Sequence, residues 1–350
     1  MTESRKNNHN HYPKMNKPKL SDNAPTLVDL CSCGGGIKTG AILAGVRPLV
    51  GIEYDPKEPG LSQHYKFVQN VNFAEYGSTL QLQTVQAAAA SDFAGVPRNP
   101  TILHASPPCT NYTKLRTLNK TTETLADIEI GQAVSSAIAT LTPEYFTLEC
   151  SPSYVKGMAY LAIKNALQAC SYHFKAYELD MMDYNTPQSR RRTFIMGWRS
   201  TNRPLKLPPK TRRIGWLEAI GWEDRKIVQP SKKQMDAIIA YFEKNHPSPI
   251  MVDKIGVSNK SLAIRQQYEP MWTITTSYFT DQNSSQRTSS LTYYHEEKMY
   301  ALRIRDVARL CGFPDWYAPS NVYSLAGKVL GNAVCPSFYS YFLKSNNLGL

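Results

Sequence analysis

Apolar positions near the start of the chain alternate between strand-like and helix-like spacing. A short apolar run at Thr26–Leu30 predicts a strand, the glycines at 34–36 predict a tight turn, and the pattern from there to Gly45 predicts a helix. Residues 48–52 predict a second strand, which ends at Glu53. This order is typical of a nucleotide-binding βαβ unit, in which the acid accepts hydrogen bonds from ribose hydroxyls. It also fits a nicotinamide-dependent enzyme, and glycine turns serve ordinary helix–strand packing as well.

The same alternation of elements continues downstream. Four more apolar runs predict strands, at 101–104, 145–148, 174–179 and 193–196, and helical patterns lie near 127–141 and 155–171. Strands that alternate with helices predict an α/β fold with a doubly wound, mostly parallel sheet. The carboxyl ends of parallel strands form the ligand-binding edge of such a sheet. Cys109, five residues after His104, and Glu149, directly after Leu148, are therefore candidate catalytic residues.

Both candidates have a chemical reason and an ordinary alternative. Cys109 follows Pro107 and Pro108, which stiffen its approach from the strand, and a rigidly held thiolate suits nucleophilic catalysis. A buried structural cysteine is the alternative. The Glu149 carboxylate, if partly desolvated, can hold or donate a proton near neutrality, whereas a solvated or helix-capping glutamate is its alternative.

A third candidate group lies where three arginines lead into an apolar strand. Gln188, Arg190 and Arg192 share one face of an extended chain. That face presents one amide and two guanidinium groups, which suit a base edge, a carboxylate or a phosphate. A basic surface cluster is the alternative, although such clusters rarely continue into a buried strand.

The charge of the chain favours an anionic partner. Its 350 residues include 40 Lys and Arg against 28 Asp and Glu, a formal net charge of +12. Residues 186–233 contain 13 of these bases and three acids, and the stretch 203–213 within them has three prolines and predicts an extended linker. Taken alone the stretch is equally typical of a solvated basic surface, but the total favours nucleic acid or phosphate.

Composition also excludes several classes of protein. No run of 18 or more apolar residues occurs, and no apolar segment follows the basic residues of the first 25, so we expect a soluble, non-secreted, cytoplasmic protein without a membrane partner. The seven cysteines include no C-x-x-C pair, which argues against a disulfide framework and against a metal site.

Seven short segments resemble, in order, the motifs of one enzyme family. They are 29–36, 53–55, 107–109, 149–151, 184–192, 305–315 and 331–336. In these segments the chain resembles a cytosine-5 DNA methyltransferase of the prokaryotic or phage type, over most of residues 26–342. The resemblance implies a Rossmann-like class I methyltransferase sheet with a smaller, inserted target-recognition domain.

The resemblance also implies roles for the candidate residues. The Cys109 thiolate adds to carbon 6 of a flipped-out cytosine, Glu149 binds ring nitrogen 3 and the exocyclic amine, and Arg192, supported by Arg190, fixes the carbonyl oxygen. The cofactor is S-adenosylmethionine, with no metal, and its implied binding residues are Asp29, Cys31, Ser32, Gly34, Gly36, Glu53, Tyr54, Pro107, Asn332 and Val334. We expect contacts to DNA from Gln188, from the loop residues Asn111, Thr113 and Arg116, and from the linker bases Lys206, Lys210, Arg212 and Arg213.

By the same resemblance the chain divides into four parts. These are a flexible basic tail at 1–25, a catalytic and cofactor-binding domain at 26–198, a target-recognition region at 199–300, and a framework helix with a returning C-terminal helix at 301–350. Residues 269–275 resemble the strand that returns the chain to the family framework. We expect a monomer that acts on duplex DNA at the nucleoid of a prokaryotic or phage-infected cell, with a restriction endonuclease as a companion.

Five positions depart from the family pattern. Cys31 stands where the family usually has a phenylalanine that packs on the adenine, and Cys33 where it has a glycine. Cys150 replaces the asparagine of Glu-Asn-Val, and residues 105–106 replace Gly-Gly. Two alternatives stay open. One is a tRNA cytosine-5 methyltransferase, which shares the catalytic motifs, and the other is a catalytically inactive methyltransferase-like protein that binds DNA, which Cys31 and Cys33 favour. A nicotinamide-dependent enzyme explains only the first 55 residues.

Overall fold

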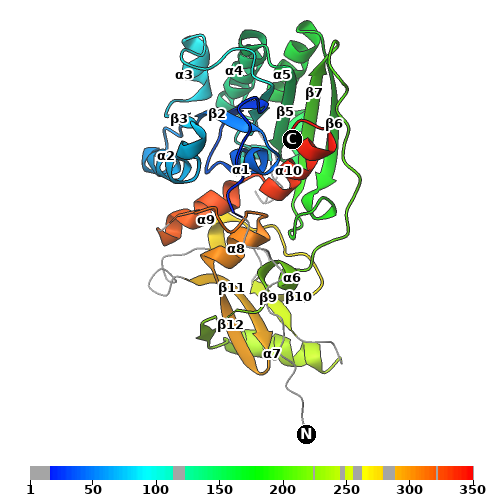
Figure 1. Cartoon of the computed structure of the whole chain (residues 1–350). Helices are drawn as coiled ribbons and strands as arrows, with labels where there is room; N and C mark the ends of the chain where they lie inside the picture. Colours follow the sequence, from blue (N-terminus) through cyan, green and yellow to red (C-terminus); the bar gives the residue numbers. More distant parts are fainter. Residues whose placement is uncertain are drawn as a thin grey trace.

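The molecule consists of two layered parts stacked end to end (Figure 1). The computed structural model describes residues 16–112, 123–223, 225–244, 249–254, 262–278, 288–320 and 322–349. The upper part in Figure 1 is built on a seven-stranded sheet, and the lower part on a five-stranded sheet. Within the described residues, no helix is both long and apolar enough to cross a membrane.

The larger sheet is mostly parallel, as the pattern of the sequence predicts. Its strands are β1 (Thr26–Leu30), β2 (Arg47–Ile52), β3 (Thr79–Gln81), β4 (Ile102–Ala105), β5 (Tyr145–Cys150), β6 (Tyr172–Asp180) and β7 (Arg191–Arg199). They lie in the order β3-β2-β1-β4-β5-β7-β6, and β7 runs antiparallel to both of its neighbours. The doubly wound α/β fold class is therefore confirmed.

Helices cover both faces of this sheet because successive residues of each buried strand point to opposite sides. On one side the core joins the sheet to α3 (Val85–Ala90), α4 (Leu125–Leu141) and α5 (Met158–Ala169). On the other side it joins the sheet to α1 (Gly36–Leu43) and α10 (Pro336–Ser345). The backbones of α1 and α10 approach closely at Gly40, where an added Cβ would lie 2.8 Å from the Pro336 carbonyl oxygen. Both ends of the chain thus complete one domain, as the red and blue helices of Figure 1 show.

The smaller part is an antiparallel sheet with few helices. The larger part also contains α2 (Pro59–Phe73). The smaller part and its junction with the larger one contain α6 (Trp216–Ile220), β8 (Ile227–Val228), α7 (Lys232–Phe242), β9 (Ile250–Lys254), β10 (Leu262–Gln266), β11 (Thr288–His295), β12 (Lys298–Arg303), α8 (Ile304–Leu310) and α9 (Tyr323–Asn332). The strand order is β10-β9-β11-β12-β8. These strands lie mostly within residues 199–300, the range predicted for target recognition, while β12 crosses residue 300 and α8 and α9 lie beyond it.

One hydrophobic cluster joins the two parts. It contains Phe73 of α2, Trp216 of α6, Val307 of α8 and Val329 of α9. Next to it, a fully buried ion pair joins Arg225 to Asp306 across 2.9 Å. Helices α8 and α9 therefore form the joint between the parts, and only α10 returns to the larger sheet.

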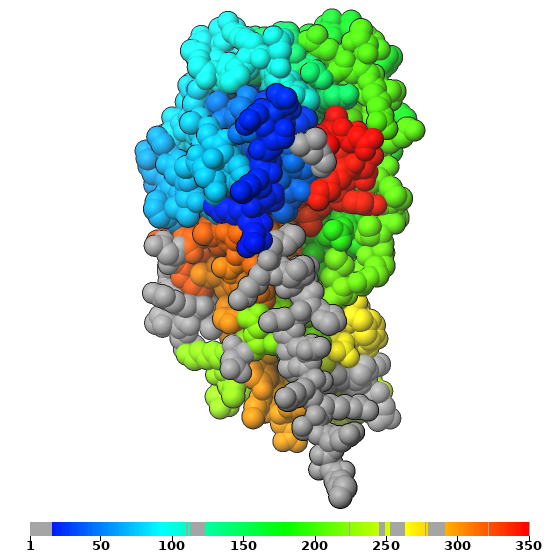
Figure 2. Space-filling model, in the orientation of Figure 1, coloured from blue at the N-terminus to red at the C-terminus, as the bar shows by residue number. Residues whose placement is uncertain are grey.

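The described end of the predicted N-terminal tail is packed against the protein. Lys17 Nζ donates to the Asn72 carbonyl oxygen and pairs with Glu75, and the Tyr76 hydroxyl donates to the Pro18 carbonyl oxygen across 2.9 Å. Figure 2 shows this dark-blue segment on the surface between light-blue and red residues. The prediction of a flexible tail is therefore wrong for residues 16–25, and residues 1–15 lie outside the described part.

The strands and helices predicted from apolar periodicity are present, with ends that differ by a few residues. The sequence pattern missed β3, a strand of only three residues. Residues 269–275 were expected to form a strand, but Met271 makes only an isolated bridge to Gln188. Glu149, expected just after its strand, is part of β5 because the pairing with β7 continues through Cys150.

Candidate active site

Three of the predicted motifs meet at one edge of the larger sheet. Leu30 at the end of β1 pairs with Ala105 at the end of β4, and Ala105 pairs with Leu148 of β5. Because these strands are parallel, the loop after β1, the loop after β4 and the end of β5 lie side by side. Residues far apart in the sequence are thereby brought to one site.

Cys109 lies in the loop after β4, partly exposed and without a disulfide partner. The pKa of its thiol is lowered from 9.0 to about 6, above all by a hydrogen bond from the Cys150 thiol and also by the Arg192 charge and the Ser151 backbone N–H. Burial and the Glu149 carboxylate act in the opposite direction. At neutral pH the thiolate therefore predominates, which is the nucleophilic form of cysteine.

Glu149 and Arg192 form an ion pair beside this thiol. The Glu149 Oε1 and Arg192 Nε atoms are 2.9 Å apart, and the two side chains are 7% and 16% exposed. Glu149 lies opposite Phe194 in the antiparallel β5–β7 pair, so Arg192, two residues away on β7, shares its face. The two strands thus hold a carboxylate and a guanidinium group next to Cys109.

The other two residues of the Gln-x-Arg-x-Arg motif are turned inward. The Arg190 guanidinium group donates to the carbonyl oxygens of Ile274 and Gly331, across 3.3 Å and 3.2 Å. Gln188 is 1% exposed, and its Oε1 accepts from the Ile274 backbone N–H across 2.9 Å. The predicted contact of Gln188 with DNA is therefore wrong for this arrangement, since the buried amide joins the two parts of the protein. Arg190 likewise holds the main chain around the site.

The loop after β1 is lined by acids. Asp29 is buried, and its Oδ2 accepts from the Ser32 hydroxyl across 2.6 Å, while its Oδ1 has no hydrogen-bond partner among the described residues. Burial raises the pKa of Asp29 to about 7, although Ser32 and the Lys38 charge lower it. Cys31 and Cys33 adopt left-handed backbone angles, with φ of 57° and 43°, a conformation that favours glycine.

The remaining predicted cofactor residues surround this loop. The Glu53 carboxylate accepts from the Cys33 backbone N–H across 2.8 Å, and burial raises its pKa. Tyr54 follows it, half-buried, and Asn332 donates to the Tyr65 hydroxyl across 3.2 Å. The backbone approaches closely at the glycines, because a Cβ at Gly34 would meet Val329 and one at Gly36 would meet the Val334 carbonyl oxygen. Pro107 lies on the nucleophile side, where its carbonyl oxygen is 3.8 Å from Cys150 Sγ.

These residues fit a cationic nucleoside such as S-adenosylmethionine. The buried Asp29 Oδ1 lacks a donor within the described structure, and the Glu53 carboxylate at the end of β2 can accept from ribose hydroxyls. Two acids also favour an amino group and a sulfonium charge over a phosphate. Among the described residues, no cluster of His, Cys, Asp and Glu could hold a metal ion.

Two residues of this site were missed by the sequence analysis. Lys38 of α1 is fully buried, and its Nζ donates to Ser78 Oγ and to the Thr79 carbonyl oxygen, both across 2.9 Å. Burial lowers the pKa of Lys38 to about 7. Gln69 of α2 donates to Ser32 Oγ across 2.9 Å. Lys38 could have been found from the sequence, because it is a charged residue on the apolar face of the first helix. Nothing in the pattern of α2 marks Gln69.

The predicted DNA contacts of the linker are mostly paired within the protein. Asp183 accepts from Lys210 across 2.8 Å and from Arg213 across 3.0 Å, and Arg212 pairs with Glu218. The Lys206 side chain is exposed, while its backbone N–H donates to the Asn346 side chain. Of the predicted loop contacts, Asn111 donates to Asp127 across 2.8 Å, and Thr113 and Arg116 lie outside the described residues.

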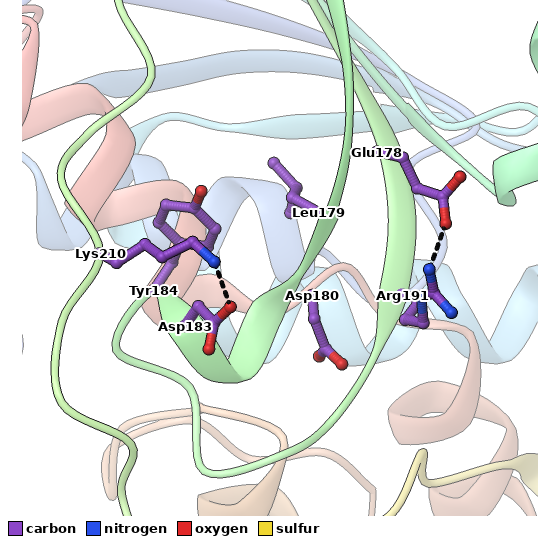
Figure 3. A pocket seen from close by; sticks show the side chains of 7 residues that line it. All are labelled: Glu178, Leu179, Asp180, Asp183, Tyr184, Arg191 and Lys210. Atoms are coloured by element: carbon purple, nitrogen blue, oxygen red, sulfur yellow. Dashed lines mark hydrogen bonds and ion pairs between the residues drawn. The ribbon is translucent and has the colours of Figure 1, made fainter.

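A surface pocket of about 310 Å³ lies under this linker, at the β6–β7 end of the same sheet edge (Figure 3). It is lined by Glu178, Leu179, Asp180, Asp183, Tyr184, Arg191 and Lys210. Figure 3 shows Lys210 pointing to Asp183 and Arg191 pointing to Glu178. Arg191 therefore faces away from the site that contains its neighbour Arg192.

The fold defines a class I methyltransferase. The chain belongs to the C-5 cytosine-specific DNA methylase family, whose model matches residues 26–346. It is therefore a DNA (cytosine-5-)-methyltransferase that uses S-adenosylmethionine.

Several solved methyltransferase structures share this fold. One is a candidate DNA modification methyltransferase encoded within a prophage of E. coli, with a TM-score of 0.62, 18% identity and coverage of 93% of this chain and 99% of that chain. Another is the DNMT2 of Spodoptera frugiperda, with a TM-score of 0.59, 16% identity and coverage of 92% and 99%. A third is the methyltransferase EhMeth of Entamoeba histolytica, with a TM-score of 0.60, 11% identity and coverage of 92% and 97%. A search of curated proteins finds no match.

Proposed function

We propose that the protein methylates carbon 5 of a cytosine that is flipped out of a specific duplex DNA sequence, through a covalent adduct with Cys109. The observation that carries the proposal is the thiol of Cys109, whose pKa is about 6, next to the Glu149–Arg192 ion pair. A thiolate, a carboxylate and a guanidinium group within one site are what addition to a cytosine ring requires.

In the proposed reaction the Cys109 thiolate attacks carbon 6 of the base and forms a carbon–sulfur bond. Glu149 holds a proton at ring nitrogen 3 and accepts from the exocyclic amine, so the electron pair of the broken double bond stays at carbon 5 as an enamine. Arg192 orients Glu149 and donates to the carbonyl oxygen of the base. Carbon 5 then forms a bond to the electrophilic methyl group that S-adenosylmethionine would supply, while the methyl–sulfur bond breaks and leaves S-adenosylhomocysteine. Transfer of the carbon 5 proton to solvent lets the ring double bond form again, so the bond between carbon 6 and the Cys109 sulfur breaks and the thiolate leaves.

The cofactor would lie between the acids of the first two strands. Asp29 and Glu53 would receive its amino and ribose groups, and the glycines at 34 and 36 keep the backbone close. Its methyl group must lie near Cys109, and the adjacent ends of β1 and β4 provide that proximity. The target sequence would be read by the smaller part of the protein.

Transfer of labelled methyl groups tests this proposal. The purified protein should methylate carbon 5 of cytosine in duplex DNA, and bisulfite sequencing should identify the target sequence. A duplex with 5-fluorocytosine at that target should be trapped covalently on Cys109, because fluorine cannot leave as a proton does. Methylation of tRNA but not DNA, methylation of adenine, or the absence of a trapped complex would contradict the proposal.

The linker bases are proposed to contact phosphates without regard to sequence. Replacement of Lys206, Lys210, Arg212 and Arg213 by alanine should weaken binding to every duplex and flatten the salt dependence by roughly one unit of slope for each phosphate that is no longer neutralised. Replacement of Lys66 and Lys175, exposed bases on α2 and β6, is the control. An unchanged slope, or a changed target sequence, would show that the assignment is wrong.

A further inference from the structure

A short turn joins Cys109 to a buried tyrosine. This turn, η2 (Thr110–Tyr112), is closed by the Tyr112 backbone N–H, which donates to the Cys109 carbonyl oxygen across 3.0 Å. The Tyr112 ring is buried and packs edge-on against that of Tyr154, with the ring centroids 5.1 Å apart. Any contact that fixes the Tyr112 side chain therefore also fixes the backbone next to the thiol.

The Tyr112 hydroxyl is held by a glutamate that lies eleven residues further along the chain. It donates to Glu123 Oε1 across 2.7 Å. The same carboxylate accepts from the first two backbone N–H groups of α5, from Met158 across 2.7 Å and from Ala159 across 2.8 Å. The first N–H groups of a helix have no acceptor within the helix, so a carboxylate stabilises them. Glu123 thus joins the tyrosine to the start of a helix that packs on the larger sheet.

Two further contacts show how closely this region is packed. Asn111 Nδ2 donates to Asp127 Oδ2 across 2.8 Å, so the turn is tied to α4 as well. An added Cβ at Gly157 would lie 2.6 Å from Glu123 Oε1 and 3.0 Å from the Tyr112 ring. Gly157 has an extended backbone, with φ of −91°, which any residue adopts. Glycine is therefore required at position 157 by the space that the carboxylate and the phenol occupy.

The hydrogen bond between the tyrosine and the glutamate has an ionised acceptor. Burial raises the pKa of Glu123, but hydrogen bonds from Ala159, Tyr112 and Met158 outweigh it and hold the pKa below its ordinary value. The Asp127 charge acts in the same direction as burial. Burial and the Glu123 carboxylate raise the pKa of Tyr112, so the phenol keeps its proton and donates it. A hydrogen bond to an ionised acceptor is stronger than one between neutral groups.

We propose that Glu123 is a positioning residue, which holds the turn after Cys109 through the Tyr112 hydroxyl and so fixes the place of the thiol. The proposal rests on the proposed function, since it takes Cys109 as the nucleophile. Glu123 contributes to the geometry of attack on the base, where a displacement of about 1 Å can cost about 10²-fold in rate. The alternative is that Glu123 only caps α5, in which case the Tyr112 hydroxyl has no effect on the rate.

Three variants separate positioning from capping. Tyr112→Phe removes only the hydroxyl, Glu123→Gln keeps the shape but removes the charge, and Gly157→Ala places a methyl group against the carboxylate. Each should lower the single-turnover rate constant of methyl transfer by about 10–100-fold, with the Kd for DNA and for S-adenosylmethionine changed by less than about twofold. Glu129→Gln on α4 and Tyr160→Phe on α5 are the matched controls and should keep the wild-type rate.

A double variant tests whether the two side chains act as a unit. Tyr112→Phe combined with Glu123→Gln should be no slower than the slower single variant, because both changes weaken the same contact. An unchanged rate in Tyr112→Phe, fully additive losses in the double variant, or a loss confined to the melting temperature would overturn the proposal.

Hydrogen–deuterium exchange gives a readout that needs no methyl transfer. The peptide that spans residues 107–112 should exchange faster in Tyr112→Phe, Glu123→Gln and Gly157→Ala than in the wild type, because the hydrogen bond that closes the turn at Cys109 opens more often. Equal exchange in all of these proteins would also overturn the proposal. If exchange rises as expected but the wild type transfers no methyl group to DNA, the proposed function fails while the role of Glu123 in holding the turn stands.

Discussion

Two neighbouring loops at the same sheet edge shift the pKa of their cysteines in opposite directions. The loop after β1 contains Cys31 and Cys33, and the loop after β4 contains Cys109, with the ends of β1 and β4 paired in register. The pKa values of Cys31 and Cys33 are raised well above 9.0, whereas that of Cys109 is lowered to about 6. Burial acts in the same direction in both loops, so it does not explain the difference.

The difference comes from the partners that each loop meets. Burial and the carboxylates of Asp29 and Glu53 raise the pKa of the first two thiols. The Cys150 thiol, the Arg192 charge and the Ser151 N–H lower that of Cys109 against its burial. One edge of one sheet thus provides an acidic half suited to a cationic cofactor and a nucleophilic half suited to a base.

The largest expected difference in methyl transfer is between serine substitutions of Cys109 and of Cys31, one in each loop. Cys109→Ser should lower the rate of methyl transfer by at least about 10³-fold, because a serine hydroxyl is not ionised near neutrality. Binding to DNA should be largely kept, since it depends on phosphate contacts elsewhere. Cys31→Ser is the matched change and should cost less than about tenfold. Equal losses in single-turnover assays would contradict the division between the loops.

Removal of the Arg192 charge should slow methyl transfer at the half of the site that contains Cys109. Arg192→Met should lower kcat by about 10²–10³-fold, because it removes a preorganised charge and leaves Glu149 buried without its ion-pair partner. The neighbouring Arg191→Met is the control, since Arg191 is exposed and pairs with Glu178. If both variants lose the same activity, the ion pair is not specific to the site.

The contrast between the loops should be visible in the reactivity of the three thiols. In the wild type, alkylation of Cys109 should rise through pH 6 and level off, because its pKa lies below neutrality. Alkylation of Cys31 and Cys33 should still be rising at pH 9, because their pKa values lie above it. At pH 7 Cys109 should therefore be mostly thiolate, whereas Cys31 and Cys33 should be mostly thiol. The acid limb of methyl transfer should likewise lie near pH 6, and a limb near pH 8.5 would contradict the comparison.

The smallest expected effect concerns the acidic half. If an aromatic ring at position 31 packs on the adenine, Cys31→Phe should tighten binding of S-adenosylmethionine by up to about tenfold, since such contacts contribute about 0.5–1.5 kcal/mol. Calorimetry on the two proteins measures this change. Equal or weaker binding would mean that the loop, with its left-handed residue 31, is built around the smaller side chain.

Much of the fold and of the site was determined by local features of the sequence. Apolar periodicity located the strands that became β1, β2, β4, β5 and β7, because a buried strand must be apolar whatever it packs against. It also located β6, an edge strand in which only Tyr172 and Leu179 are buried. The prolines before Cys109 and the alternation at 188, 190 and 192 are also local, and so they marked the motifs. The family followed from the order of such motifs.

Only the tertiary structure decided how the side chains of these motifs are used. Gln188, Arg190 and Arg192 share one strand face in the sequence, yet Gln188 and Arg190 bind the main chain of the smaller part and only Arg192 reaches Glu149. The contact of the Cys150 thiol with the Pro107 carbonyl oxygen joins residues 43 positions apart and depends on the pairing of β4 with β5. Periodicity is a property of neighbouring residues, but burial, hydrogen bonding and pKa depend on groups that are brought together only when the chain folds.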